Sequence, residues 1–325
     1  MGKNNTAVRQ YLSDTSRFAD IVNGTIFGGK QVVHPEELEQ VDGESDVLFV
    51  DKEGNEKNVQ RYRDITMRWK QGMNLVIMAC ENQEKVHYAM PVRTMLYDSL
   101  SYVDQIKKKW TMTEKSHYTS EEFLSKFQKG DLIYPVITIV LYYGLTEWDA
   151  SEDLYGMFQI DEMFRENKVL QQYISNYKIN LLNVGKIEHL ENFKTDLQNV
   201  FGMLQYKSNT EKLVEYVQEH KDFFQGIDQD TYYAIRAFLH SENKLKKALT
   251  KAKENGEERV DMCKALDDLY NSGVEQGQKE GRDQEKREVA NRLLGFLEVE
   301  RIAEVVGLDL EVVKGLENKH IVVES

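Results

Sequence analysis

Long apolar runs are absent from this sequence of 325 residues. No stretch reaches the roughly 18 consecutive apolar residues that indicate a membrane-spanning helix. Residues 1–11 are polar and lack the apolar segment of a secretory signal. We therefore expect a cytoplasmic protein with no membrane partner.

Cysteine is scarce, and the histidines are scattered. The two cysteines, Cys80 and Cys263, lie far apart, and Cys80 falls in an apolar run where a free thiol is a small core residue. We expect neither a disulfide nor a zinc site. No Ser/His/Asp triad, phosphate-binding glycine loop or paired-histidine metal motif is visible.

Positive charge is in deficit. The 55 acidic residues against 42 Lys and Arg give a formal net charge of −13 at pH 7. This balance argues against broad attraction to nucleic acid, because phosphate contacts dominate that affinity. A DNA-binding function would need an uneven charge distribution. Basic residues do gather in one part of the chain, at Arg61, Arg63, Arg68, Lys70, Lys85, Arg93 and Lys107 to Lys109.

A buried strand is predicted at residues 75–80, which form an unbroken apolar run between Gly72 and Glu81. If residues 70–73 form a hairpin turn, antiparallel pairing brings Asp64 opposite about Glu81. Side chains alternate along a strand, so Gln83 shares a face with Glu81. Two carboxylates and an amide would then meet at one end of the strand.

Such a group of oxygen ligands suits one or two hard cations such as Mg²⁺. A metal held there would polarise a phosphoryl oxygen and lower the pKa of a bound water. The alternative is that Asp64 and Glu81 are ordinary solvated acids at strand ends, and their spacing alone does not decide between the two interpretations.

The order of motifs resembles that of the PD-(D/E)xK nuclease superfamily. Asp64, Glu81-x-Gln83 and the segment from Met90 to Tyr97 are more closely similar to the recombination-promoting nuclease or YhgA-like putative transposase family, whose site ends in Glu-x-Gln. The strand-like segment at 134–144 with Trp148, and the segment at 192–196, are also similar to that family. The resemblance extends over roughly residues 8–240.

The resemblance implies that Asp64 and Glu81 bind Mg²⁺ or Mn²⁺ and that Gln83 takes the place of the usual catalytic lysine. An amide can donate a hydrogen bond but carries no charge. Gln83 could suffice with the metal, a cation such as Lys85 or Arg93 could compensate, or this chain could cleave poorly. In the superfamily an acid of the first helix often adds to the metal ligands.

Asp20 is our candidate for that additional ligand, and an ordinary acid on a helix surface is the alternative. For contacts with nucleic acid we expect Arg63, Lys85, Arg93 and Tyr97. Arg93 and Tyr97 lie one helical turn apart, so a phosphate contact and simple packing of the arginine on the tyrosine are both open.

Hydrophobic patterning gives the rest of the expected elements. Helices are expected within 5–23, from 35 to 40, from 86 to 106 and from Thr119 to 130, and strands at 47–50, 133–143 and 179–184. Further helices are expected at 153–164, 188–206, 210–224 and 228–249. Gly273, Gly277 and Gly281 share one face of a long charged helix or lie in a linker, and such a face could pair two copies of the chain.

The fold class that the resemblance implies is α/β, with a restriction-endonuclease-like core, a central mixed sheet flanked by helices, and an α-helical C-terminal extension. We expect a nuclease core over 1–150, a helical elaboration packed on it over 151–250, the charged glycine-spaced helix or linker over 251–287, and a helix-turn-helix-like tail over 288–325.

The function expected from this resemblance is metal-dependent endonuclease cleavage of DNA, in a transposase-like or recombination setting, with a homodimer through the C-terminal helices as one arrangement. The alternative is a catalytically weak module that keeps the nuclease fold and binds nucleic acid or protein. A helical scaffold that acts through its charged tail is the third possibility.

Overall fold

The computed structural model describes residues 3–41, 44–50, 56–62, 65–80, 86–112, 118–159, 167–241, 245, 250 and 259–324. The predicted site residues Arg63, Asp64, Glu81, Gln83 and Lys85 lie outside these described residues. The chain divides into two compact units, Met1–Met262 and Cys263–Ser325. No described helix has the length and apolar character that a membrane crossing requires.

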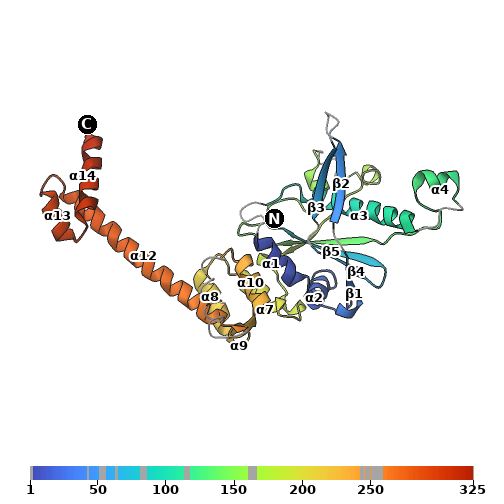
Figure 1. The fold of residues 1–325 in the computed structure, drawn as a ribbon, viewed down its shortest axis with the longest axis horizontal. Helices are drawn as coiled ribbons and strands as arrows, with labels where there is room; N and C mark the ends of the chain where they lie inside the picture. Colours follow the sequence, from blue (N-terminus) through green and yellow to red (C-terminus); the bar gives the residue numbers. More distant parts are fainter. Residues whose placement is uncertain are drawn as a thin grey trace. The chain divides into compact units, whose positions relative to one another are not determined.

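A mixed five-stranded sheet with the order β1-β4-β5-β6-β7 forms the centre of the N-terminal unit (Figure 1). Its strands are β1 (Leu38–Gln40), β4 (Ile65–Trp69), β5 (Met73–Cys80), β6 (Val136–Tyr142) and β7 (Asn180–Asn183). β4 runs antiparallel to β1 and β5, whereas β5, β6 and β7 are parallel. The predicted mixed sheet flanked by helices is confirmed, and its parallel strands end at one edge.

The β4–β5 hairpin is confirmed, but its predicted register is wrong. The expected pairing of Asp64 with Glu81 requires Ile65 to lie opposite Cys80, whereas Ile65 pairs with Ile77. The turn is tighter than expected because Gly72 adopts φ +83° and donates its N–H to the carbonyl of Trp69 at 2.9 Å. Asp64 and Glu81 themselves lie outside the described residues, and their convergence stays a prediction.

Helix α3 (Met90–Met112) covers one face of the sheet, where Met90 and Tyr97 pack against Val140 of β6. The helix predicted at 86–106 is thus confirmed with later bounds. Its buried Asp98 accepts hydrogen bonds from Thr138 of β6 at 2.6 Å and from Tyr177 at 2.5 Å. These bonds satisfy the carboxylate, so it fixes α3 to the sheet.

Helices from both ends of the N-terminal unit meet at the end of β6. Phe238 makes edge-to-face contacts with Tyr11 and with Tyr143, which directly follows β6. Besides α3, the described α-helices of this unit are α1 (Lys3–Leu12), α2 (Thr15–Ile26), α4 (Ser120–Ser125), α6 (Lys168–Gln171), α7 (Leu197–Leu204), α8 (Thr210–Glu219), α9 (Lys221–Phe224) and α10 (Gln229–Phe238). Two smaller antiparallel pairs are β2 (Glu44–Val50) with β3 (Glu56–Tyr62), and β8 (Ile227–Asp228) with β9 (Arg259–Val260).

Three predicted helices are corrected. Residues 35–40 form a single 3-10 turn, Pro35–Glu37, followed by β1, because pairing with β4 overrides the local helix signal. Within 153–159 only the 3-10 turn Tyr155–Met157 is helical. The helix predicted at 188–206 is divided into the 3-10 turn Leu190–Asn192 and α7, because the backbone N–H groups of Lys194 and Thr195 bond to a side chain of α2.

The C-terminal unit contains most of α12 (Met262–Leu293) together with α13 (Val299–Val306) and α14 (Leu310–Glu324). The predicted long helix is therefore confirmed from Met262 onward. A Cβ atom at Gly273, Gly277 or Gly281 would meet no atom within 4 Å. A small core of Ala290, Leu294, Ile302, Ala303 and Val313 joins the three helices. Pairing of two chains through this region stays a prediction.

Gly29, which follows α2, should tolerate no larger residue. It has φ +84°, and an added Cβ would lie 2.9 Å from the backbone Cα of Asn192. We expect Gly29→Ala to lower the free energy of unfolding by about 3 kcal/mol, since left-handed strain costs roughly 1 kcal/mol and overpacking roughly 2 kcal/mol. Urea unfolding measures the change. Gly28→Ala is the matched control, because Gly28 has φ +58° with open space around it; equal losses would contradict the predicted clash.

Candidate functional site

The parallel strands β5, β6 and β7 end side by side at one edge of the sheet. Cys80 pairs with Tyr142, and Tyr142 pairs with Asn183, so the last residues of the three strands are in register. Sites of α/β proteins commonly form beyond the carboxyl ends of parallel strands. Glu81 follows Cys80 in the chain, so this edge is the part of the fold to which the predicted Glu81-x-Gln83 motif is attached.

Lys207 brings a cation to this edge. It lies three residues beyond α7, is half-buried, and donates a hydrogen bond from Nζ to the carbonyl of Tyr143. Burial lowers the pKa of Lys207 to about 8. In the described parts of the chain no carboxylate pairs with it. Lys207 was not among the residues predicted from the sequence, because a single lysine after a helix carries no distinctive pattern; its hydrogen bond to the residue that follows β6 reveals its place.

Asp20, the predicted additional metal ligand, is buried in α2 with 2% of its surface exposed. Its carboxylate accepts the backbone N–H of Lys194, the backbone N–H of Thr195 and the hydroxyl of Thr195 at 2.6 to 2.9 Å. Within the described ranges, no three His, Cys, Asp or Glu side chains are grouped to hold a metal. The hydrogen bonds account for the burial of Asp20 without a cation.

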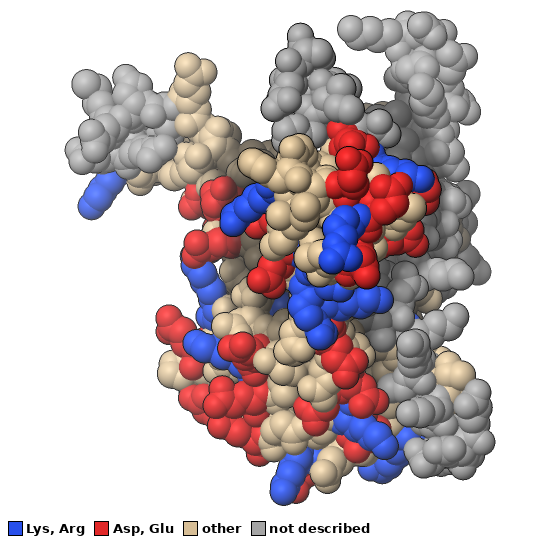
Figure 2. Space-filling model, turned by 90° about the vertical axis from the view of Figure 1, so that its left-hand side faces the viewer, with Lys and Arg blue, Asp and Glu red and all other residues tan. Residues whose placement is uncertain are grey.

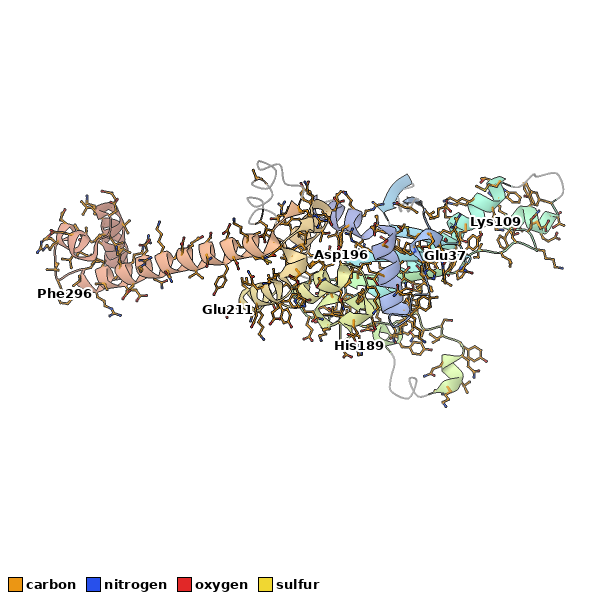
Figure 3. All side chains as sticks on the ribbon, turned by 90° about the horizontal axis from the view of Figure 1, so that it is seen from below. Glu37, Lys109, His189, Asp196, Glu211 and Phe296 are labelled. Carbon is orange, nitrogen blue, oxygen red and sulfur yellow. The ribbon has the colours of Figure 1, made fainter. Side chains whose placement is uncertain are left out.

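A second polar cluster lies one turn earlier on α2. Arg17 forms a two-pronged ion pair with Asp196, with Nε and Nη2 each 2.9 Å from a carboxylate oxygen. Tyr11 donates to Asp196 at 2.9 Å, and the Thr231 hydroxyl, with its one proton, lies 2.9 Å from Asp228 and 3.2 Å from Asp196. Figure 3 shows Asp196 among the helices of the N-terminal unit. Burial, followed by the charge of Asp196, raises the pKa of Tyr11 well above its usual value. The cluster ties α1 and α2 to α7 and α10.

The described residues of the N-terminal unit line at least two clefts. One, of about 460 Å³, borders this second cluster and is lined by Arg17, Asp196, Asp228 and Arg259 among others. The other, of about 510 Å³, lies beside the end of β7 and is lined by residues that include Asn183, Lys186 and His189. Neither cleft includes Arg93 or Tyr97, so the predicted nucleic-acid contacts do not line them.

Arg93 and Tyr97 do come together on α3. The guanidinium carbon of Arg93 lies 5.6 Å from the ring centroid of Tyr97, a cation–π distance. This is the packing alternative that the sequence left open, and contact with phosphate stays a prediction. Of the lysines near the end of α3, Lys108 pairs with Asp104 and Lys109 pairs with Asp131. The face drawn in Figure 2 likewise carries acidic and basic side chains interspersed.

In a comparison with protein families, residues 114–233 match the family described as putative transposase, YhgA-like. The family resemblance is thereby confirmed for this segment, which contains β6, β7, α7 and Lys207 and begins after Asp64, Glu81 and Gln83. Comparisons with curated proteins and with solved structures found no match.

Proposed function

We propose that this chain is a metal-dependent DNA endonuclease of the transposase-like kind. The observation that carries the proposal is the family match over residues 114–233 on a mixed sheet. In that sheet, β5 leads into Glu81-x-Gln83 at the shared carboxyl edge. A fold alone does not define chemistry, so the proposal also depends on the acids attached to that edge.

In the proposed site Asp64 and Glu81 hold the metal. Two carboxylates with a neighbouring amide form an all-oxygen donor set, which fits Mg²⁺ or Mn²⁺. When bound, the ion would polarise the scissile phosphate and lower the pKa of an attacking water. Gln83 would orient a water or a phosphate oxygen through its amide, which donates without charge. Asp20 is left out of this donor set because its oxygens already accept three donors.

Cleavage of supercoiled plasmid tests the proposal. The chain should nick DNA with Mg²⁺ or Mn²⁺ and not with a chelator, and Asp64→Ala or Glu81→Ala should each reduce the rate by about 100-fold or more, since even indirect changes at metal sites cost roughly 10- to 100-fold. The exposed Glu211, on α8, supplies the matched control Glu211→Ala. Each metal should also raise the melting temperature of the native chain and not that of Asp64→Ala.

Two other results have distinct meanings. Metal-dependent nicking that survives both substitutions would refute the assigned residues. DNA binding without cleavage under any metal would instead support the weak interaction module, for which the absence of a lysine at Gln83 and the net charge of −13 are the favourable observations.

A further inference from the structure

Gln83 brings no charge to the proposed site, and Lys85, one of the two cations that could compensate for it, lies outside the described residues. Arg93 lies on α3, whose Met90 and Tyr97 pack against Val140, and it is stacked on Tyr97. Side chains of a strand alternate between faces, so the residue that follows Tyr142 turns to the face opposite Val140. Lys207 donates to the backbone carbonyl of that residue, Tyr143, whose ring contacts Phe238 of α10.

The register of the parallel strands connects Lys207 with the proposed site. Cys80 and Tyr142 are partners at the end of β5 and β6. Glu81 and Tyr143 are the next residues of their chains, each about 3.8 Å from the preceding Cα. The ammonium that holds the Tyr143 carbonyl therefore lies within a few residues' reach of the start of Glu81-x-Gln83, although Lys207 is more than 120 positions away in sequence.

The electrostatic setting of Lys207 is costly for a purely structural residue. A half-buried ammonium loses hydration, and one carbonyl acceptor returns little of that free energy. No described carboxylate offsets its charge, and burial alone lowers its pKa to about 8. Ionisable groups with strongly shifted pKa values cluster at functional sites.

We propose that Lys207 supplies the positive charge that Gln83 lacks, by contacting a non-bridging oxygen of the scissile phosphate; this inference rests on the proposed nuclease function. The charged Nζ keeps its proton and stabilises the negative charge that grows on the phosphate during cleavage. In this proposal the positive charge comes from the segment after α7, whereas the usual catalytic lysine would stand at the position of Gln83, after β5.

Single-turnover cleavage by the 325-residue chain tests this role. Lys207→Met, which keeps the apolar stem, should reduce the rate by about 100-fold or more, the loss typical of one electrostatic donor. Its melting temperature should stay equal or rise, because an unpaired buried charge is removed. Lys212→Met, on the exposed side of α8, is the matched control and should change neither quantity. A lower melting temperature with an unchanged rate would show a structural role only and overturn the proposal.

The pH profile and a second substitution sharpen the test. Because Lys207 acts in its charged form, the rate should fall as pH rises through about 8, the value to which burial lowers its pKa. Lys207→Arg should move this decline to higher pH, since guanidinium stays charged. Gln83→Lys should restore part of the rate lost in Lys207→Met; a rate that increases above pH 8, or a double variant no faster than Lys207→Met, would overturn the proposal.

Failure of this proposal is separable from failure of the proposed function. If Asp64→Ala abolishes cleavage but Lys207→Met does not affect it, only the lysine role fails. Acetylation by an amine-reactive reagent gives a readout that needs no cleavage: a bound DNA duplex should slow the labelling of Lys207 and leave Lys212 unchanged. Full labelling of Lys207 in the complex would contradict the proposal, and no binding of duplex would refute the nuclease function itself.

Discussion

Asp20→Asn is expected to lower the free energy of unfolding by about 3 kcal/mol. The carboxylate accepts three donors that lie more than 170 positions away. An asparagine offers one acceptor oxygen and turns an NH₂ group toward the remaining donors, and hydrogen bonds to charged groups contribute roughly 1.5 to 3 kcal/mol each. Urea unfolding of the metal-free chain measures the loss.

The neighbouring Asp14 supplies the control. It caps α2 by accepting the backbone N–H groups of Ser16 and Arg17 on an exposed surface. Asparagine caps helices about as well as aspartate, so Asp14→Asn should leave stability unchanged. The loss in Asp20→Asn should be the same with and without Mg²⁺. If Mg²⁺ widens the difference between native chain and variant, Asp20 is a metal ligand after all, because a ligand that binds only the native site stabilises it.

The sequence allowed prediction of the elements that depend on local pattern. Apolar runs located β5 and β6, because a strand buried on both faces is apolar throughout, and helical spacing located α3, because an amphipathic helix repeats its apolar residues once a turn. The direction of β6 relative to β5 stayed open in the sequence and is parallel in the structure. The β4–β5 register was wrong because Trp69 pairs with Met73, so residues 70–72 form the turn that had been predicted at residues 70–73.

Long-range contacts explain what the sequence could not indicate. The residues around Lys194 do have helical spacing, but the Asp20 carboxylate accepts the N–H groups that would continue the helix. Neither segment carries a pattern that indicates its contact with the other. Lys207 likewise lies near the end of β6 through a long-range contact, its hydrogen bond to the carbonyl of Tyr143. The family match begins after Asp64 and Glu81. It therefore supports the later part of the fold, and the roles of Asp64 and Glu81 stay predictions.

The other large effect is expected at the ion pair that joins α2 to α7. The side chains of Arg17 and Asp196 are only 17% and 18% exposed, and they are linked by a two-pronged contact. Arg17→Met would leave the Asp196 carboxylate without a charge partner, with the Tyr11 hydroxyl as donor and the Thr231 hydroxyl shared with Asp228. Removing one member of a buried pair costs roughly 3 to 5 kcal/mol, because the other charge stays desolvated. We expect a loss near the lower end, about 3 kcal/mol, measured by urea unfolding.

The double variant Arg17→Met with Asp196→Asn separates the pair from its surroundings. If the cost arises from the orphaned charge, the double variant should be no less stable than Arg17→Met alone, since the second change removes that charge. Arg301→Met is the control, because Arg301 pairs with Glu304 at 2.5 Å on a surface where both side chains are more than 60% exposed. It should leave the stability of the chain unchanged. Additive losses in the double variant would show that Arg17 and Asp196 stabilise the fold independently, through Tyr11 and Thr231 and not through each other.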